Sequence, residues 1–537
     1  MNKEIVLPAD EMYVPAINLR AGNVTAIYEE GRLRYVTAGD TEIVRTIYPA
    51  LRDEQWSTVI PVISNEKISR EQRSFYITYT ALYEAGDIRF KAVYKIEGRT
   101  DNTITFSMKG EGLSNFKKRR IGLCLLHPIA SCTGREIEVR QPDNTTYSSS
   151  FPEFVSPFQP FLQVQGMKWM TANNTFVEIG YEGDIFETED QRNWSDNSYK
   201  TYSTPQSVPA PAMVNTGDTV EQKITIKADV KKTVFKKDRV IQKENRLPFP
   251  RIGYTRGVDQ QALTRTQIKL LAKIPFDHYR VQLNLAENWK EVLSSAAEEA
   301  EWLSARLELI ITFGLLNDEE INAVIDALRS PQQLVHSILI LSSHHETVPK
   351  EFFAHAYEGI KNAYAAISIG FGTGGDFSDL NGNRPAEIEY DFVSFSLQPQ
   401  VHTKDNRSIM ENLGSHETLL RSADKFTGGK PVHISPVSFS SADTADKRFG
   451  SAFAAWWTLL ALRNLSAASD ISFYELTGSR GIINGEAETE IYKALKEIKE
   501  FSPRYIFQNT GNKVILQNES GNRLVFTSKL PLPGSAG

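Results

Sequence analysis

Three side chains in the second half of the chain have the chemistry of an acid–base site. Asp379 and Glu475 carry carboxylates, and His402 carries an imidazole. Each comes at or just after the end of a short apolar run, where a buried strand would open into polar chain. Carboxylates and an imidazole at one place can supply a general base, a proton donor and an orienting group. We therefore predict Asp379, Glu475 and His402 as catalytic residues.

The elements that must position them lie between residues 251 and 501, where strand-like runs alternate with helical patterns. The predicted strands are 251–255, 278–284, 307–313, 336–341, 366–371, 392–397, 431–437 and 471–474. The predicted helices are 259–273, 288–305, 318–329, 350–364, 408–425, 449–465 and 486–501, with the weakest helical pattern in the fifth unit. This alternation favours a closed TIM (β/α)8 barrel over an open sheet. The strands of such a barrel end at one rim, where the three catalytic candidates would meet.

Both ends of the chain have a β-type pattern instead. From residue 21 to about 236, alternating polar and apolar runs are separated by turns, and no long helical pattern occurs. This favours a large N-terminal β-sandwich. Three more short runs follow residue 503. The predicted fold class is multidomain, α/β plus all-β. The expected domains are an N-terminal β-sandwich (1–245), a TIM barrel (246–502) and small C-terminal β strands (503–537) that pack on one of the other two domains.

A second polar cluster lies in the β-rich half. Residues 186–205 mix tryptophan, arginine, asparagine and carboxylates with little strand alternation. This composition suits either a solvated hairpin loop or a loop that binds a polyhydroxylated ligand, and the sequence leaves both interpretations open. Together with polar residues of the barrel rim, the predicted substrate-binding residues are Glu187, Asp190, Gln191, Arg192, Asn193, Trp194, Lys200, Asn381, Arg384 and Gln400.

Composition argues against several classes of function. The net charge is −6, with acidic and basic residues mixed along the chain, so no nucleic-acid partner is expected. No run approaches the roughly 20 apolar residues of a membrane-spanning helix, and the start of the chain lacks the apolar core of a signal peptide. The two cysteines, Cys124 and Cys132, lie in or beside one apolar run. We expect them to be buried thiols of a reduced, cytoplasmic protein without a membrane partner.

Motifs for cofactors and metals are weak. Residues 370–375 match G-x-G-x-x-G, but no helical pattern opens at the last glycine, so close strand packing is favoured over dinucleotide binding. His344, His345 and Glu346 are adjacent, and adjacent side chains seldom converge on one ion. His433, inside the seventh predicted strand, is expected to be a hydrogen-bonded core histidine. We predict no cofactor and no metal site, and a small carbohydrate or sugar acid as the ligand.

A long and unusual motif, EDQRNWSD, occupies residues 189–196. Further distinctive stretches lie at 47–53, 56–59, 126–128, 200–202, 377–381, 383–385, 399–402 and 474–481. In these stretches, which run in order through most of the chain, the sequence resembles the D-apionate lactonases of bacterial apiose catabolism. The resemblance implies an N-terminal β domain, a TIM barrel and a C-terminal β domain. It also implies hydrolysis of a branched-sugar lactone to its aldonate.

The sequence departs from the family pattern at three places. Asp379 stands where a glutamate is expected, and Gln282 stands where an aspartate is expected. Residues 438–441 lack an arginine-containing segment that is expected after the seventh strand. A shorter carboxylate and a lost arginine would reshape the pocket, so the substrate can differ from that of the family.

The preferred hypothesis is a hydrolase that opens a D-apionolactone-like lactone by water attack on the carbonyl carbon. Asp379 or Glu475 would act as general base, and His402 with Arg192 would stabilise the oxyanion or deliver the proton. One alternative is a glycoside hydrolase that uses two carboxylates at the barrel mouth. A second alternative is a non-catalytic carbohydrate-binding protein.

Overall fold

The computed structural model describes residues 2–230, 245–257, 260–440, 446–531 and 533. The chain divides into two compact units. One unit comprises residues 14–191 and 197–238, and the other comprises residues 1–13, 192–196 and 239–537. The five residues 192–196 therefore interrupt the first unit in the chain but belong with the second. The predicted domain boundaries at residues 245 and 502 remain predictions.

The first unit is built from two large antiparallel sheets. Its strands are β2 (Ile17–Ala21), β3 (Val24–Glu29), β4 (Arg32–Ala38), β5 (Thr41–Arg52), β6 (Val62–Arg70), β7 (Phe75–Ala85), β8 (Ile88–Gly98), β9 (Thr103–Gly112), β10 (Phe116–Lys118), β11 (Arg120–Pro128), β12 (Glu136–Arg140), β13 (Thr146–Ser150), β14 (Phe161–Val164), β15 (Gly166–Met170), β16 (Thr175–Glu182), β17 (Phe186–Asp190), β18 (Ser198–Tyr202), β19 (Ala212–Val214) and β20 (Thr219–Val230). One sheet has the order β14-β17-β18-β11-β5-β4-β3-β2, and the other has the order β13-β12-β15-β16-β20-β9-β8-β7-β6. A short helix, α1 (Ile129–Cys132), follows β11. The predicted N-terminal β domain is confirmed.

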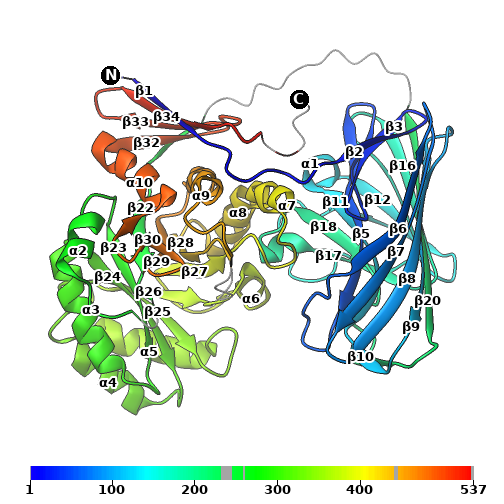
Figure 1. Cartoon of the computed structure of the whole chain (residues 1–537). Helices are drawn as coiled ribbons and strands as arrows, with labels where there is room; N and C mark the ends of the chain where they lie inside the picture. Colours follow the sequence, from blue (N-terminus) through cyan, green and yellow to red (C-terminus); the bar gives the residue numbers. More distant parts are fainter. Residues whose placement is uncertain (1, 231–244, 258–259, 441–445, 532, 534–537) are drawn as a thin grey trace. The chain divides into compact units, whose positions relative to one another are not determined.

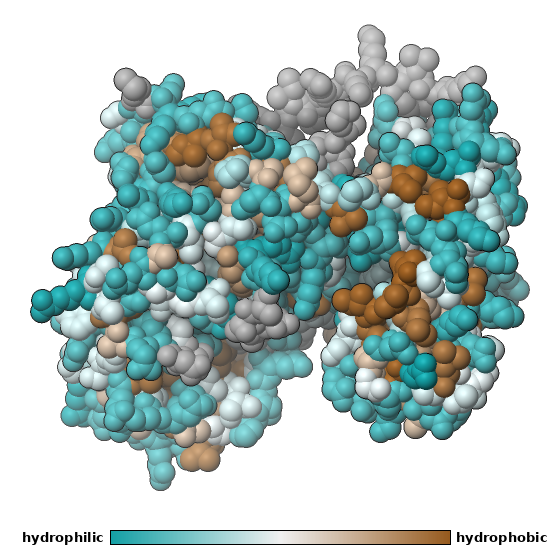
Figure 2. Space-filling view, in the orientation of Figure 1, coloured by the Kyte–Doolittle hydropathy of each residue, from teal (hydrophilic) through white to brown (hydrophobic). Residues whose placement is uncertain are grey.

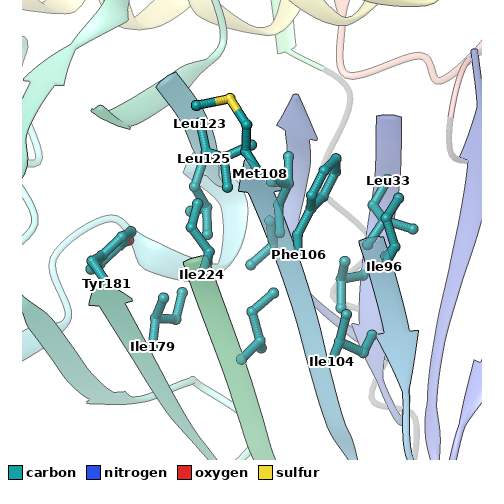
Figure 3. Packing of buried hydrophobic residues seen from close by; sticks show 14 of the residues in the cluster. Leu33, Ile96, Ile104, Phe106, Met108, Leu123, Leu125, Ile179, Tyr181 and Ile224 are labelled. Carbon is teal, nitrogen blue, oxygen red and sulfur yellow. The ribbon is translucent and has the colours of Figure 1, made fainter. Parts of the chain in front are cut away.

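Strand alternation explains the core of this unit. In β8, every second side chain from Ile88 to Ile96 is buried, and the residues between them are exposed. Side chains of both sheets form one hydrophobic cluster, part of which is seen in Figure 3, where Leu123 of β11 lies near Met108 of β9. Each large apolar side chain buried in this way contributes about 1.5–3 kcal/mol. Both cysteines are buried free thiols, as predicted.

The second unit contains a closed parallel barrel. Its strands are β22 (Arg251–Thr255), β23 (His278–Asn284), β24 (Arg306–Phe313), β25 (Val335–Ser342), β26 (Ser368–Gly372), β27 (Phe392–Leu397), β28 (Val432–Val437) and β29 (Asp470–Thr477). They pair in this order, and β22 also pairs with β29, which closes the ring. The helices are α2 (Arg265–Leu271), α3 (Trp289–Leu303), α4 (Asp318–Leu328), α5 (Lys350–Ala363), α6 (Phe377–Gly382), α7 (Asn406–Asn412), α8 (His416–Thr427), α9 (Ala452–Asn464) and α10 (Glu490–Phe501), and Figure 1 shows α2 to α5 along the outside of the ring. The predicted TIM barrel is confirmed.

The barrel helices differ from the predictions at three places. The predicted helix 259–273 is the shorter α2, which begins after a capping box at Thr264; residues 258 and 259 lie outside the described residues. The fifth unit has only the six-residue α6, in line with its weak helical pattern. The predicted helix 408–425 is two helices, α7 and α8, joined by a 3-10 turn at Leu413–Ser415. The side chains of Asn412 and Ser415 at this break bond to residues 195 and 196.

A small sheet accompanies the barrel in the same unit. Its order is β1 (Lys3–Leu7), β34 (Arg523–Ser528), β33 (Val514–Asn518), β32 (Pro503–Gln508) and β21 (Asn245–Pro248). The pairing of β1 with β34 is parallel and joins the two ends of the chain. Asp10 follows β1 and accepts hydrogen bonds from the backbone amides of Ala452 and Phe453 at the start of α9. The predicted C-terminal β strands are therefore present, with partners from two earlier segments. A short hairpin, β30 (Gly481–Asn484) with β31 (Ala487–Glu488), extends β29.

The amino-terminal end of the barrel interior holds a polar cluster, buried except at the half-buried His336. Its members are His278, Glu308, His336, His433 and Asp470, which lie within the first three residues of their strands. His433 Nε2 is 3.0 Å from Asp470 Oδ2, and its Nδ1 is 3.5 Å from Glu308 Oε1. Burial alone would lower the pKa of His433, but the contacts with Asp470 and Glu308 outweigh it and raise the pKa above its ordinary value. His433 is thus a core histidine, as predicted.

We expect the contribution of His433 to stability to depend on pH. Its folded-state pKa is raised, so its stabilising effect is complete below the unfolded value of about 6.5 and is lost as pH rises through the folded value. A His433→Asn variant should be destabilised by about 3 kcal/mol near pH 6. The difference from the wild-type protein should shrink as pH is raised from 6 through and beyond the unfolded value. Melting temperatures of both proteins across this range test it, and a difference independent of pH would contradict it.

The surface is mainly hydrophilic in the view of Figure 2, with separate hydrophobic patches. Large apolar side chains that are exposed include Ile60, at 78%, and Leu315, at 73%, one in each unit. Isolated exposures of this kind are ordinary for folded proteins. In the described part of the chain, no helix has both the length and the apolar character needed to cross a membrane.

Candidate active site

The carboxyl end of β26 supplies one carboxylate of the site. The strand ends at Gly372, and α6 begins five residues later, so Asp379 lies in the first turn of a short helix directly above the barrel strand. Asp379 Oδ2 accepts a hydrogen bond from Thr373 Oγ1 at 3.1 Å, and Oδ1 accepts one from Ser378 Oγ at 3.1 Å. Burial raises the pKa of Asp379, and the two hydroxyl donors oppose this shift. Asp379 is therefore a partly buried carboxylate at the rim.

Residues 192–196 form the second part of the site. Asn193 Oδ1 accepts a hydrogen bond from Asn381 Nδ2 at 2.9 Å, which ties this segment to α6. The carbonyl oxygen of Ser195 accepts one from Ser415 Oγ at 2.7 Å, at the break between α7 and α8. Arg192 is fully buried. Residues 192–196 lie between β17 and β18 in the sequence. They are held by α6 and by the break between α7 and α8 of the barrel unit.

Asp196 and His402 form a hydrogen-bonded pair at the centre of this arrangement. His402 Nδ1 lies 2.5 Å from Asp196 Oδ2, and the other carboxylate oxygen accepts a hydrogen bond from Asn412 Nδ2 at 2.8 Å. The Trp194 ring stands edge-on to the imidazole, with centroids 5.7 Å apart. In the neutral tautomer that donates Nδ1–H to this carboxylate, Nε2 carries the lone pair. Nε2 makes no hydrogen bond to any described residue, and 19% of the His402 side chain is exposed.

The remaining rim candidates are engaged with neighbouring side chains. Glu475 forms an ion pair with Arg480. Gln400 donates from Nε2 to the carbonyl oxygen of Phe439 at 2.8 Å and to Asp446 Oδ2 at 2.9 Å, and its Oε1 accepts from Arg448 at 3.2 Å. The nitrogen and the oxygen of the Gln400 side-chain amide are therefore both hydrogen-bonded to other residues of the barrel unit. We interpret Gln400 as a residue that positions the loop after β27.

Arg384 and Asn381 present a polar surface beside Asp379. Arg384 donates from Nε and Nη2 to Asn381 Oδ1, at 3.2 and 2.7 Å. Its guanidinium lies 5.1 Å from the centre of the Phe426 ring. Asn381 thus has its oxygen on Arg384 and its amide nitrogen on Asn193, which fixes its orientation. An ordered amide and a guanidinium are suited to bind hydroxyl or carboxylate oxygens of a sugar acid.

The predicted binding residues of the β unit are buried and paired. Glu187 Oε1 accepts from Tyr202 OH at 2.6 Å, and Lys200 Nζ contacts Glu189 Oε1 at 2.8 Å. Asp190 Oδ2 accepts from the amide of Ser156 at 3.0 Å, and Gln191 Oε1 accepts from Ser198 Oγ at 3.0 Å. These contacts make the end of the β17–β18 hairpin a rigid polar structure. Their part in ligand binding remains a prediction.

The glycine-rich motif of residues 370–375 has a packing role in the barrel. A Cβ atom on Gly372 would lie 2.0 Å from the carbonyl oxygen of Ser394, and one on Gly370 would lie 2.2 Å from the Phe392 ring. Both glycines therefore allow β26 to approach β27 closely. Among the residues that the structure describes, no group of three or more His, Cys, Asp or Glu side chains is placed to hold a metal ion.

The structure brings six of the predicted residues together, namely Asn193, Trp194, Asp379, Asn381, Arg384 and His402. Sequence reasoning did not select Asp196, Asp376 and Asn412. Asp196 ends the EDQRNWSD motif, so its position in that motif was the available signal. Asp376 lies in the polar segment after the fifth strand and could have been found in the same way. Asn412 lies in a helical pattern and gives no local signal.

Two family models match the sequence in succession. The model for the N-terminal domain of D-apionate lactonase matches residues 6–231, and the model for the TIM barrel domain of D-apionate lactonase matches residues 252–444. The chain belongs to the D-apionate lactonase family. A D-apionate lactonase from Brucella anthropi is 26% identical over 514 residues, which cover 88% of this chain and 84% of the relative.

Solved structures are more distant from this D-apionate lactonase family member. A β-glucuronidase from Bacteroides uniformis has 10% identity and a TM-score of 0.36, with 82% of this chain and 54% of that chain covered. A family 51 α-L-arabinofuranosidase from Bifidobacterium longum has 10% identity and a TM-score of 0.35, with 52% and 78% covered. Similarities as low as these decide nothing about fold or function.

The positions that depart from the family pattern lie in the barrel unit. Gln282 is an exposed residue of β23, on the same alternating face as His278 and Arg280, which line the barrel interior. Asp379 has the two hydroxyl partners already described. Ser440 is buried after β28, whereas Ser441 lies outside the described residues.

Proposed function

We propose that the protein hydrolyses a sugar-derived lactone, of the D-apionolactone type, to the corresponding sugar acid. The observation that carries this proposal is the Asp196–His402 pair at the barrel rim of a D-apionate lactonase family member, in which the His402 side chain is 19% exposed. An imidazole oriented by a carboxylate is an effective general base towards water. Glu475 is paired with Arg480, and Asp379 is held by two hydroxyl groups, so His402 is the best-placed base.

In the proposed mechanism, water attacks the lactone carbonyl carbon as its proton passes to His402 Nε2. Asp196 holds the Nδ1–H and stabilises the imidazolium that forms. Arg192 is proposed to stabilise the oxyanion, and Asn381 with Arg384 is proposed to bind substrate hydroxyl groups. Collapse of the tetrahedral intermediate breaks the bond between the carbonyl carbon and the ring oxygen, which gives a hydroxy acid.

A substrate screen tests the proposal. The purified full-length protein is supplied with a panel of sugar lactones that includes D-apionolactone, and acid release is followed with a pH indicator. We expect hydrolysis of at least one branched-sugar lactone above the rate without enzyme. Aryl glycosides are assayed in parallel. Release of aryl alcohol without lactone hydrolysis would favour the glycoside hydrolase hypothesis, and calorimetric binding of a sugar acid without turnover would favour a binding protein.

A further inference from the structure

Asp376 is an unusual residue at the start of α6. It occupies the N-cap position, where an aspartate normally accepts a hydrogen bond from a backbone amide of the first turn. Asp405 does so at the start of α7, and Asn317 does so at the start of α4. Asp376 makes no such bond, and its Oδ1 is buried without a hydrogen-bond partner among the described residues. Its carboxyl group is therefore not used to stabilise the helix.

The surroundings of Asp376 favour its neutral, protonated form. Burial raises the pKa of this carboxyl group most, and repulsion from Asp379 and then Asp196 raises it further, to about 7. Asp379 has two hydroxyl donors that stabilise its charge, whereas Oδ1 of Asp376 has none. When two neighbouring carboxylates compete for one proton, the group without donors keeps it. Asp376 is thus placed to carry a proton within electrostatic range of Asp196, the partner of His402.

We propose that Asp376 is the general acid that protonates the leaving ring oxygen during lactone hydrolysis. This rests on the proposed function, in which His402 takes the proton of the attacking water. As the carbon–oxygen bond of the lactone breaks, the bonding pair passes to the ring oxygen, and the Asp376 carboxyl proton is transferred to it. The products are a free hydroxyl group and a carboxylic acid. The enzyme is left with an Asp376 carboxylate and a His402 imidazolium, which exchange the proton through solvent before the next turnover.

Leaving-group chemistry separates this role from a structural one. An alkoxide is a very poor leaving group unless it is protonated, whereas a thiolate, with a thiol pKa of about 8.5, leaves without a proton. The experiment compares wild-type protein, Asp376→Asn and the exposed-site control Asp318→Asn on a sugar lactone and on the matching thiolactone. We expect Asp376→Asn to lower kcat on the lactone by about 100-fold and on the thiolactone by less than about 5-fold. Asp318→Asn should leave both rates unchanged.

The pH profile gives a second, independent readout. The wild-type kcat/KM on the lactone should fall on the alkaline side, as Asp376 loses its proton at a pKa of about 7. An Asp379→Asn variant removes one repelling charge, so this alkaline limb should move to lower pH. This variant keeps Asp376 in place, so it tests the proposal even if Asp376→Asn does not fold.

Three results would overturn the assignment. These are an equal loss on lactone and thiolactone in Asp376→Asn, no loss on either, or an alkaline limb that does not move in Asp379→Asn. Failure of the proposed function itself has a different signature, because the wild-type protein would then hydrolyse neither the lactone nor the thiolactone.

Discussion

Replacing His402 by asparagine is expected to lower kcat for lactone hydrolysis by about 1,000-fold. Asparagine is close to histidine in size near the backbone and can still hydrogen-bond to Asp196, but it cannot accept a proton from water. Steady-state kinetics on the best lactone from the screen measure the effect. KM should change little, because His402 is proposed to act on water and not on the sugar.

His355→Asn is a matched control for this variant. His355 is an exposed histidine of α5 that also contacts an aspartate, with Nε2 2.7 Å from Asp318 Oδ1. Losing it should leave kcat unchanged, since this pair lies outside the candidate active site. A His402→Asn protein that keeps more than about a tenth of wild-type kcat would rule out His402 as the general base.

Asp196→Asn is expected to lower kcat by about 100- to 1,000-fold, with the fold intact. The amide can donate a hydrogen bond to His402 Nδ1, which then carries the lone pair, so the ring proton moves to Nε2. With a proton already on Nε2, the imidazole cannot accept another from water. The carboxylate that would stabilise the imidazolium is lost as well.

The position of the ring proton is what distinguishes this role from simple packing. Nitrogen-15 NMR of the imidazole should show protonation mainly at Nδ1 of His402 in the wild-type protein and at Nε2 in Asp196→Asn. Asp318→Asn serves as the control, because it removes an exposed aspartate that pairs with a histidine. An unchanged kcat in Asp196→Asn would exclude a role for this carboxylate in catalysis.

The barrel was predictable because its signals are local. Strands β22, β23 and β27 have the predicted bounds, and the other barrel strands begin and end within three residues of the predictions. Most of them are short runs with apolar residues buried on both faces, a pattern that can be read from the sequence alone. The interruption of the predicted helix 408–425 was not predicted. Gly414 in the break is a local signal that disfavours a continuous helix, but only the tertiary structure shows that Asn412 and Ser415 there bond to residues 196 and 195.

The candidate site was predicted in part. The polar residues after barrel strands, such as His402 and Asp379, were found because a barrel collects strand ends at one rim. The general base that the sequence favoured, Asp379 or Glu475, was chosen from residue type alone. We propose His402 as the base instead, because Glu475 is paired with Arg480 and His402 is hydrogen-bonded to Asp196.

The sequence by itself determined the β domain, the barrel and the family, because periodicity and motifs are properties of neighbouring residues. Only the tertiary structure decided that Asp196 meets His402, 206 residues further along the chain, and that β1 pairs with β34. It also decided that Asp376 has a carboxyl oxygen buried without a partner. The physical reason is that burial and hydrogen bonding depend on groups that lie far apart in the sequence and meet only on folding. A local sequence pattern does not indicate which distant groups will meet.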